Sequence, residues 1–284
     1  MGRDVWESSA AAREVFETAD RVLGYALSRL CFEGPEVRLR ETEYTQPAIF
    51  TTSLACLAAA VEAGAVDARP AFTAGHSLGE YSALVAAGAL SLEEGLRLLA
   101  ARARLMADAG RSNPGTLAAI LGMQEDAVRA ICSDADVDVC NYNLPNQTVV
   151  GGSRANVEHA IELAKQRGAQ RAMELNVSGA FHSRLMRPAA EGLTPLVIAA
   201  EVNAPQVSVV ANASGEAMRD AAAIRDELCA QVVTAVRWHE SVTLMAGAGV
   251  SRFIEFGPGR VLTGMVKRLV PDATLINVSG LQPV

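Results

Sequence analysis

The sequence lacks the marks of a secreted, disulfide-bonded or membrane-spanning protein. Its five cysteines are odd in number and never fall in a C-x-x-C pair, so reduced thiols are the simplest interpretation. The first 19 residues mix Arg, Asp and Glu with apolar residues, without the continuous apolar stretch of a secretory signal. The most apolar stretches, such as 54–61 and 81–90, are short and rich in alanine, well below the roughly 20 residues that a spanning helix needs. We therefore expect a soluble, cytoplasmic protein.

An excess of positive charge is also missing. The chain has 25 Lys and Arg residues and 32 Asp and Glu residues, which gives a formal net charge of −7. This charge gives no overall attraction to nucleic acid or to an anionic membrane. Half of the 284 residues are apolar and a fifth are charged, a balance typical of a globular enzyme and not of a disordered chain. The length is sufficient for one main domain and a smaller subdomain.

The first third of the chain has helical spacing. Apolar residues recur three and four positions apart over 15–23, which predicts an amphipathic helix. A second helix is predicted over 47–63, with Gly64 closing it because glycine tolerates the left-handed conformation at a helix end. The apolar run 71–74 is too short for a buried helix and predicts an interior parallel strand. A helix over 81–89 follows almost at once.

The pattern changes after about residue 115. Strand, helix, strand, helix and strand are predicted in turn at 117–121, 125–133, 148–151, 154–168 and 171–175. Two helices crossing between three short strands indicate a small α+β layer inserted into the main chain. The final third returns to α/β texture, with strands near 207–211 and 252–256 and a helix after Gly257-Pro258-Gly259. The predicted class is therefore α/β, with a core at 1–115 and 178–284 and a small subdomain at 116–177.

The strand at 71–74 leads directly into Gly75-His76-Ser77-Leu78-Gly79 and then a helix. A strand, the pattern G-x-S-x-G and a helix form a nucleophile elbow, in which a tight turn projects the serine above the sheet edge. We expect Gly75 and Gly79 to let the strand and the helix pack closely. The N–H of Leu78 would then point toward an oxyanion formed by attack on a carbonyl. The alternative is a serine that only caps the helix between two packing glycines.

A serine hydroxyl needs a base within hydrogen-bond reach, and the chain has only four histidines. His159 lies on a polar helix face and His239 at an expected helix start. His76 sits inside the elbow, with its side chain directed away from the nucleophile or toward the pocket wall, which makes it a substrate-binding candidate. His182 remains, although an isolated histidine is more often structural. No acidic residue between Ser77 and His182 stands at an obvious strand end, so a backbone carbonyl is a possible partner for the imidazole.

Arg102 is the third candidate. It lies in a helix predicted over 96–108, whose inward face we assign to Leu96, Leu99, Ala103 and Met106, with the arginines elsewhere. An arginine-rich helix face is usually solvated. A buried arginine, however, presents a planar fork that pairs with a carboxylate through two hydrogen bonds, and an acyl substrate with a free carboxylate needs such a partner.

These residues, in this order, resemble malonyl-CoA:acyl carrier protein transacylases of type II fatty-acid synthesis, and the resemblance covers nearly the whole chain. It is carried by Tyr44-Thr45-Gln46-Pro47-Ala48, Gly75-His76-Ser77-Leu78-Gly79-Glu80-Tyr81, Arg102, the segment 143–147 before Val149-Val150, Gly179-Ala180-Phe181-His182-Ser183, and Gly257-Pro258-Gly259-Arg260-Val261-Leu262-Thr263-Gly264. The resemblance implies a hydrolase-like α/β core with a ferredoxin-like insert.

The resemblance also implies residue roles. Ser77 matches the acylated serine and His182 its base, while Gln231 matches the position whose backbone carbonyl orients that histidine. Arg102 matches the arginine that pairs with the malonyl carboxylate, and Leu78 the donor of an oxyanion N–H.

Two further positions carry pocket roles by the same resemblance. Gln147 matches a pocket residue. Phe181 matches the aromatic residue that accompanies malonyl rather than methylmalonyl preference in related polyketide acyltransferases, by filling the space of the branch methyl.

One departure concerns the start of the chain. The family begins with a strand ending in P-G-Q-G, whose glutamine gives a second oxyanion N–H, and this sequence opens just beyond that point at Met1-Gly2-Arg3. We expect either an upstream start or a protein with half of its oxyanion hole and reduced stability.

The predicted reaction is ping-pong transfer of malonyl from malonyl-CoA to the phosphopantetheine thiol of acyl carrier protein, through an acyl-enzyme on Ser77. We expect no metal, no bound cofactor, no nucleic-acid or membrane partner, and a monomer. The product feeds fatty-acid or polyketide synthesis. Two alternatives stay open: a serine esterase or thioesterase, and a non-catalytic homologue or fragment that only binds carrier protein.

Overall fold

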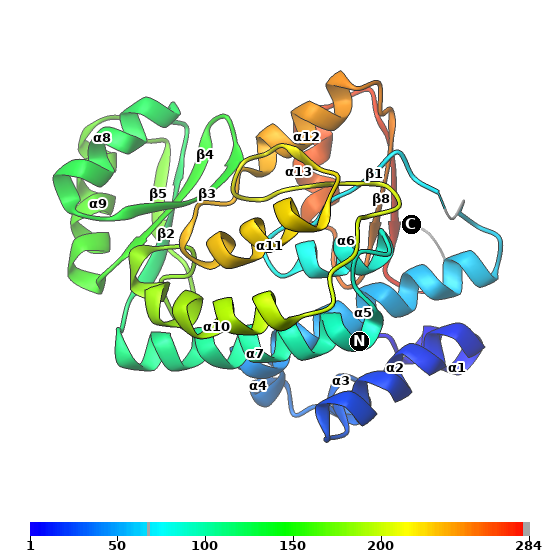
Figure 1. Cartoon of the computed structure of the whole chain (residues 1–284). Coiled ribbons are helices and arrows are strands. Elements are labelled where there is room, and N and C mark those ends of the chain that lie inside the picture. The colour runs from blue at the N-terminus through cyan, green and yellow to red at the C-terminus, as the bar shows by residue number, and fades with distance from the viewer. Residues whose placement is uncertain (67–68, 281–284) are drawn as a thin grey trace.

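The computed structural model describes residues 1–66 and 69–280 (Figure 1). In that part the helices are α1 (Arg3–Ser8), α2 (Ala10–Leu23), α3 (Leu27–Glu33), α4 (Glu36–Leu39), α5 (Thr42–Glu62), α6 (Gly79–Ala86), α7 (Leu92–Ser112), α8 (Glu125–Ala135), α9 (Arg154–Gln166), α10 (Arg187–Ala199), α11 (Ala221–Ala230), α12 (Trp238–Gly247) and α13 (Val261–Leu269), with single 3₁₀ turns at Arg184–Met186 and Gln231–Val233. No helix in it is both long and apolar enough to cross a membrane.

The strands of the described residues form three sheets, two in the core and one in the inserted layer. They are β1 (Phe72–Thr73), β2 (Thr116–Leu121), β3 (Asp138–Leu144), β4 (Gln147–Gly152), β5 (Arg171–Glu174), β6 (Ser208–Val210), β7 (Ala217–Met218), β8 (Arg252–Phe256) and β9 (Thr274–Val278). In the core, β1 pairs with β6 and β8 with β9, both parallel, while β7 adds to β6 antiparallel. The α/β class is confirmed, although the parallel strands of the core fall into two short sheets.

The inserted layer has the order β3-β4-β2-β5, with every neighbour antiparallel. Together with α8 and α9 it follows the sequence β-α-β-β-α-β, which is the ferredoxin-like motif. Figure 1 shows it in green beside the core, with α8 and α9 on the face turned away from the core. The division at residues 116 and 177 stays a prediction.

Strand β3 is the element of this layer that the sequence pattern did not predict. Its residues include Asp138, Asn141 and Asn143, which are depleted in strands. Register shifts also interrupt its pairing with β4 between Val139 and Asn141 and again farther on. Such bulges break the two-residue alternation that identifies a strand.

The predicted helices are present, with shifted ends. Helix α5 begins at Thr42, one turn before the expected start, so Pro47 lies inside it. Gly64 adopts a φ of +65° after this helix, as predicted for the residue that closes it. Helix α2 spans the predicted 15–23 pattern.

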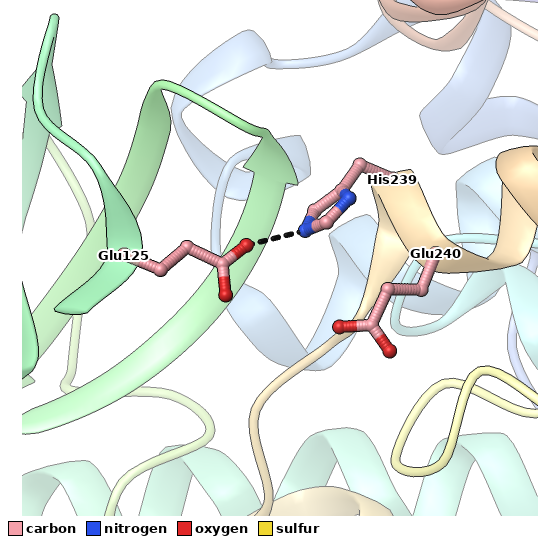
Figure 2. A group of neighbouring side chains, drawn as sticks. All are labelled: Glu125, His239 and Glu240. Carbon is pink, nitrogen blue, oxygen red and sulfur yellow. Dashed lines mark hydrogen bonds and ion pairs between the residues drawn. The ribbon is translucent and has the colours of Figure 1, made fainter.

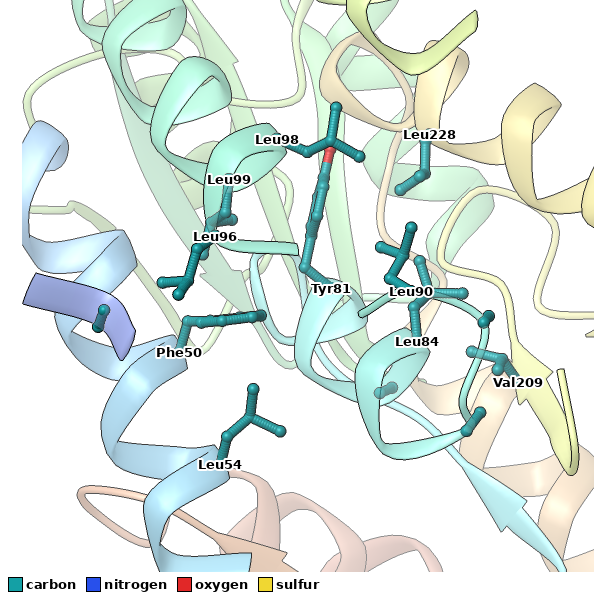
Figure 3. Packing of buried hydrophobic residues seen from close by; sticks show 14 of the residues in the cluster. Phe50, Leu54, Tyr81, Leu84, Leu90, Leu96, Leu98, Leu99, Val209 and Leu228 are labelled. Carbon is teal, nitrogen blue, oxygen red and sulfur yellow. The ribbon is translucent and has the colours of Figure 1, made fainter. Parts of the chain in front are cut away.

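The elbow helix α6 is wrapped by apolar side chains. Figure 3 shows Tyr81 and Leu84 of α6 between residues of α5 and α7 on one side and of α11 on the other. The labelled residues of this cluster are Phe50, Leu54, Tyr81, Leu84, Leu90, Leu96, Leu98, Leu99, Val209 and Leu228. Because protein interiors are close-packed, this shell holds α6, and with it the turn that precedes it, in one position.

Candidate active site

The turn between β1 and α6 holds Ser77 in a strained conformation. Ser77 has a φ of 53°, which an L-residue adopts at a cost and which marks functional turns. A Cβ on Gly75 would lie 2.0 Å from the carbonyl oxygen of Gly79, so only glycine fits there. Gly79 itself faces open space. The expectation that both glycines are needed for packing is therefore wrong for Gly79.

The Ser77 hydroxyl contacts the predicted base. Its Oγ lies 2.8 Å from Nε2 of His182, and Nδ1 of His182 lies 2.9 Å from the backbone oxygen of Gln231. A carbonyl oxygen only accepts, so Nδ1 carries the proton and Nε2 is left to accept from the serine. His182 is 3% exposed and Gln231 is 0% exposed. The geometry is that of a serine, a histidine and a neutral carbonyl in line.

His182 is held neutral by its surroundings. Burial, then the positive charge of Arg102, lower the pKa of His182 to about 3, although the hydrogen bond to Gln231 opposes this. An imidazole with so low a pKa carries no proton on Nε2 at neutral pH. It is therefore ready to accept the proton of Ser77.

Arg102 lies beside the same hydroxyl. Its NH2 group donates to Ser77 Oγ at 3.0 Å and to Oε1 of Gln231 at 2.9 Å, and NH1 donates to Oε1 of Gln46 at 2.6 Å. Arg102 is 1% exposed, which corrects the placement of this residue away from the inward face of its helix. Its positions relative to Leu99 and Met106, three and four residues away, put it on the apolar face.

The charge of Arg102 lacks a carboxylate partner at ion-pair distance within residues 1–66 and 69–280, and its Nε has no hydrogen-bond partner there. Burial lowers the pKa of Arg102, while nearby Tyr81 and Glu80 raise it. A buried guanidinium that has only neutral hydrogen-bond partners is costly, because its charge is not balanced. A bound carboxylate would relieve that cost.

Two residues of the site were not assigned from the sequence. Asn212 donates from Nδ2 to the Gly75 oxygen at 2.8 Å and accepts from the Ser77 N–H at 2.7 Å, which clamps the turn. It stands just after β6, whose carboxyl end lies beside that of β1 because the two strands are parallel, and this is the signal that could have found it. Gln46, which supports Arg102, stands in the Tyr44-Thr45-Gln46 segment without an assigned role.

The remaining predicted residues lie around this centre. His76 Nε2 lies 2.9 Å from Oδ1 of Asn143, and its ring packs 5.8 Å from the ring of Trp238. Phe181 directly precedes His182 and packs against the main core. The roles of these residues stay predictions.

Leu78 and Gln147 complete the predicted set. Leu78 directly precedes α6. Its backbone N–H makes no hydrogen bond to any residue within the described ranges. Gln147 begins β4 and pairs with Leu121, and no hydrogen bond in the described structure joins it to Ser77, His182 or Arg102.

One group of side chains has metal-ligand character. Figure 2 shows Glu125 of α8 facing His239 and Glu240 of α12. Their possible ligand atoms all lie within 4.8 Å of one another. His239 Nε2 lies 2.6 Å from Glu125, which also pairs with Arg129 at 3.3 Å, and Glu240 pairs with Arg237 at 2.7 Å. Two guanidinium groups thus already balance both carboxylates. The group links the inserted layer to α12, and His239 lies in the first turn of that helix, at the helix start that was predicted.

Comparison with known proteins identifies the family. The family model of the acyl transferase domain matches residues 1–281 of this chain. The chain belongs to the acyl transferase family. This acyl transferase is 43% identical over 289 residues to the malonyl CoA-acyl carrier protein transacylase of Bacillus subtilis strain 168, covering 100% of this chain and 90% of that protein. The predicted resemblance is confirmed.

Solved structures agree with this assignment. The acyl-carrier-protein S-malonyltransferase of Burkholderia pseudomallei 1710b is 41% identical to this acyl transferase, with a TM-score of 0.92 over 97% of this chain and 91% of that one. A malonyl-transacylase in complex with its type II polyketide acyl carrier protein is 37% identical, with a TM-score of 0.94 over 99% and 91% of the two chains.

Proposed function

We propose that this chain transfers a malonyl group from malonyl-CoA to the phosphopantetheine thiol of acyl carrier protein through an acyl-enzyme on Ser77. The observation that carries the proposal is the position of the Ser77 hydroxyl, 2.8 Å from the neutral base His182 and 3.0 Å from the buried, carboxylate-free Arg102. The names of the relatives supply the substrate and the carrier.

Two half-reactions use the same groups. His182 Nε2 takes the proton of Ser77 as Oγ attacks the thioester carbonyl, and the C–S bond to coenzyme A then breaks as the imidazolium gives that proton to the departing sulfur. The carrier thiol next loses its proton to His182 and attacks the serine ester, and Ser77 regains the proton. The Leu78 N–H is the proposed donor to the oxyanion in both halves.

Arg102 is the proposed partner of the malonyl carboxylate. Nε of Arg102 makes no hydrogen bond to a described residue, so it can donate to a bound carboxylate. The arginine lies beside the nucleophile, so a three-carbon acyl group attached to Ser77 places its carboxylate within reach. An esterase or thioesterase has no need of this arginine.

One relative supports a proposal for the pathway, and the cysteines support a proposal for the location. We propose that the product feeds fatty-acid or polyketide synthesis, since one structural relative is described with a polyketide carrier protein. Five free cysteines agree with the cytoplasm, where thiols stay reduced.

The experiment is intact-protein mass spectrometry after mixing with malonyl-CoA. The proposal predicts one long-lived malonyl adduct on the natural chain and none on Ser77→Ala. A transient adduct with release of free malonate would indicate an esterase. No adduct at all would indicate a protein that only binds carrier, and labelling of Ser77→Ala would move the nucleophile elsewhere.

A further inference from the structure

We infer that Glu80 is a positioning residue for transfer: its buried carboxyl group holds Asn212 and Gln231, which in turn fix Ser77 and Arg102. The inference deepens the proposed function and rests on it. Glu80 is the second residue of α6 and 0% exposed. It touches neither the serine hydroxyl nor the base, so the chemistry gives it no direct part.

The first arm of this network runs through Asn212. Glu80 Oε1 accepts from the backbone N–H of Asn212 at 2.8 Å and from its Nδ2 at 3.1 Å. Asn212 holds Gly75 and Ser77, the residues on either side of His76. Glu80 therefore sets the side chain that keeps the strained turn closed.

The second arm runs through Gln231. Its Nε2 donates to Glu80 Oε2 at 2.6 Å and to the Ser77 carbonyl at 2.9 Å, which leaves its Oε1 to accept from Arg102 at 2.9 Å. The partners fix which end of the amide is the donor. Glu80 thus orients the Gln231 side chain, whose Oε1 fixes the position of the NH2 group of Arg102.

Burying a carboxyl group in this position lowers the stability of the fold. Burial, then the neighbouring Glu227 carboxyl, raise the pKa of Glu80 well above its usual value. An apolar side chain of similar volume would avoid the cost of burying the carboxyl group. What it lacks is acceptor oxygens for three N–H donors at once, and that is the contribution we assign to Glu80.

The test is Glu80→Gln, which keeps the shape but replaces one carboxyl oxygen by an NH2 group, which cannot accept a hydrogen bond from Asn212 or Gln231. The rates of Ser77 acylation by malonyl-CoA and acetyl-CoA are measured per folded enzyme, together with the melting temperature. We expect malonyl acylation to fall by about 10²-fold, the effect of a misplacement of about 1 Å at a reacting group. Acetyl acylation should fall less, because only the malonyl group has a carboxylate to pair with Arg102.

The matched control is Leu84→Val, one turn farther along α6, which trims a buried side chain without touching the network. It should lower the melting temperature and leave the malonyl-to-acetyl ratio unchanged. If Glu80→Gln does not fold, Gln231→Met tests the second arm, since the backbone carbonyl that holds His182 remains. Here too the ratio should fall.

Two results overturn the inference. Glu80 would be no more than a packing residue if the folded Glu80→Gln variant kept both its acylation rates and its ratio of malonyl to acetyl acylation. Where that variant does not fold, the same conclusion follows if Gln231→Met leaves the ratio unchanged. Failure of the natural chain to be labelled by malonyl-CoA would instead refute the proposed function, and the positioning role with it.

Discussion

Replacing Arg102 by alanine is the sharpest perturbation of substrate choice. The side chain is buried, and the described part of the chain gives it no carboxylate, so a bound malonyl group would supply its ion-pair partner. Breaking a buried pair by removing one partner costs about 3–5 kcal/mol. At about 1.4 kcal/mol for each factor of ten, the kcat/KM for malonyl-CoA should fall by about 10²-fold or more.

Part of that loss is shared by every acyl donor. Arg102 also donates to Ser77 and helps lower the pKa of His182, so acetyl-CoA should lose some rate as well. The ratio of kcat/KM for malonyl-CoA to that for acetyl-CoA removes these shared effects. It should fall strongly in Arg102→Ala. Arg104→Ala, an exposed position on the same helix, is the matched control and should leave the ratio unchanged.

The assay is single-turnover acylation, followed by intact mass, with both acyl-CoA donors at the same pH and salt. An equal loss for malonyl-CoA and acetyl-CoA would refute the reasoning. Arg102 would then act on Ser77 and His182 alone, and the malonyl carboxylate would be bound elsewhere.

Three other predictions follow from the same geometry. His182→Ala should slow acylation by about 10² to 10⁴, the contribution of a positioned base, and an unchanged single-turnover rate would assign the base to another group. The folded pKa of His182 is about 3 and the unfolded value is about 6.5, so between pH 7.5 and 5 this imidazole gains a proton only when the chain is unfolded. Between pH 7.5 and 5, the free energy of unfolding of the natural chain should therefore drop by about 2 kcal/mol more than that of His182→Asn. Urea denaturation at both pH values measures these drops, and equal drops in the two proteins would contradict the prediction. Phe181→Ala should raise the rate with methylmalonyl-CoA relative to malonyl-CoA by about tenfold or more, the scale of one methyl group in a pocket; competition between the two donors measures it, and an unchanged ratio would remove Phe181 from the pocket wall.

The local parts of the site could be predicted from the sequence. The elbow could be predicted because its residues are consecutive: G-x-S-x-G between a strand and a helix is typical of the turn that carries Ser77. His182 was found by elimination among four histidines. Arg102 was recognised by residue type and resemblance, although its helical position beside Leu99 and Met106 already indicated burial.

The supporting contacts could not be predicted from local patterns: Gln231 was assigned by resemblance alone, and Asn212 was not assigned. Asn212 and Gln231 reach Ser77 across 135 and 154 positions of sequence, and only the pairing of β1 with β6 and the docking of α11 bring them there. Strand β3 was missed because its polar residues and bulges hide the alternation, yet it carries the Asn143 that contacts His76. Tertiary packing overrides local propensity at both places.

The central claim is that Ser77 carries the malonyl group between two thiols. The most direct test isolates the malonyl-enzyme, free of coenzyme A, and mixes it with holo acyl carrier protein in a quenched-flow experiment that follows the mass of both proteins. The account predicts that the label leaves the Ser77 peptide and appears on the carrier at the same rate, much faster than water releases malonate from the enzyme alone. Release of malonate at the same rate with and without the carrier, or a label that never occupied Ser77, would contradict it.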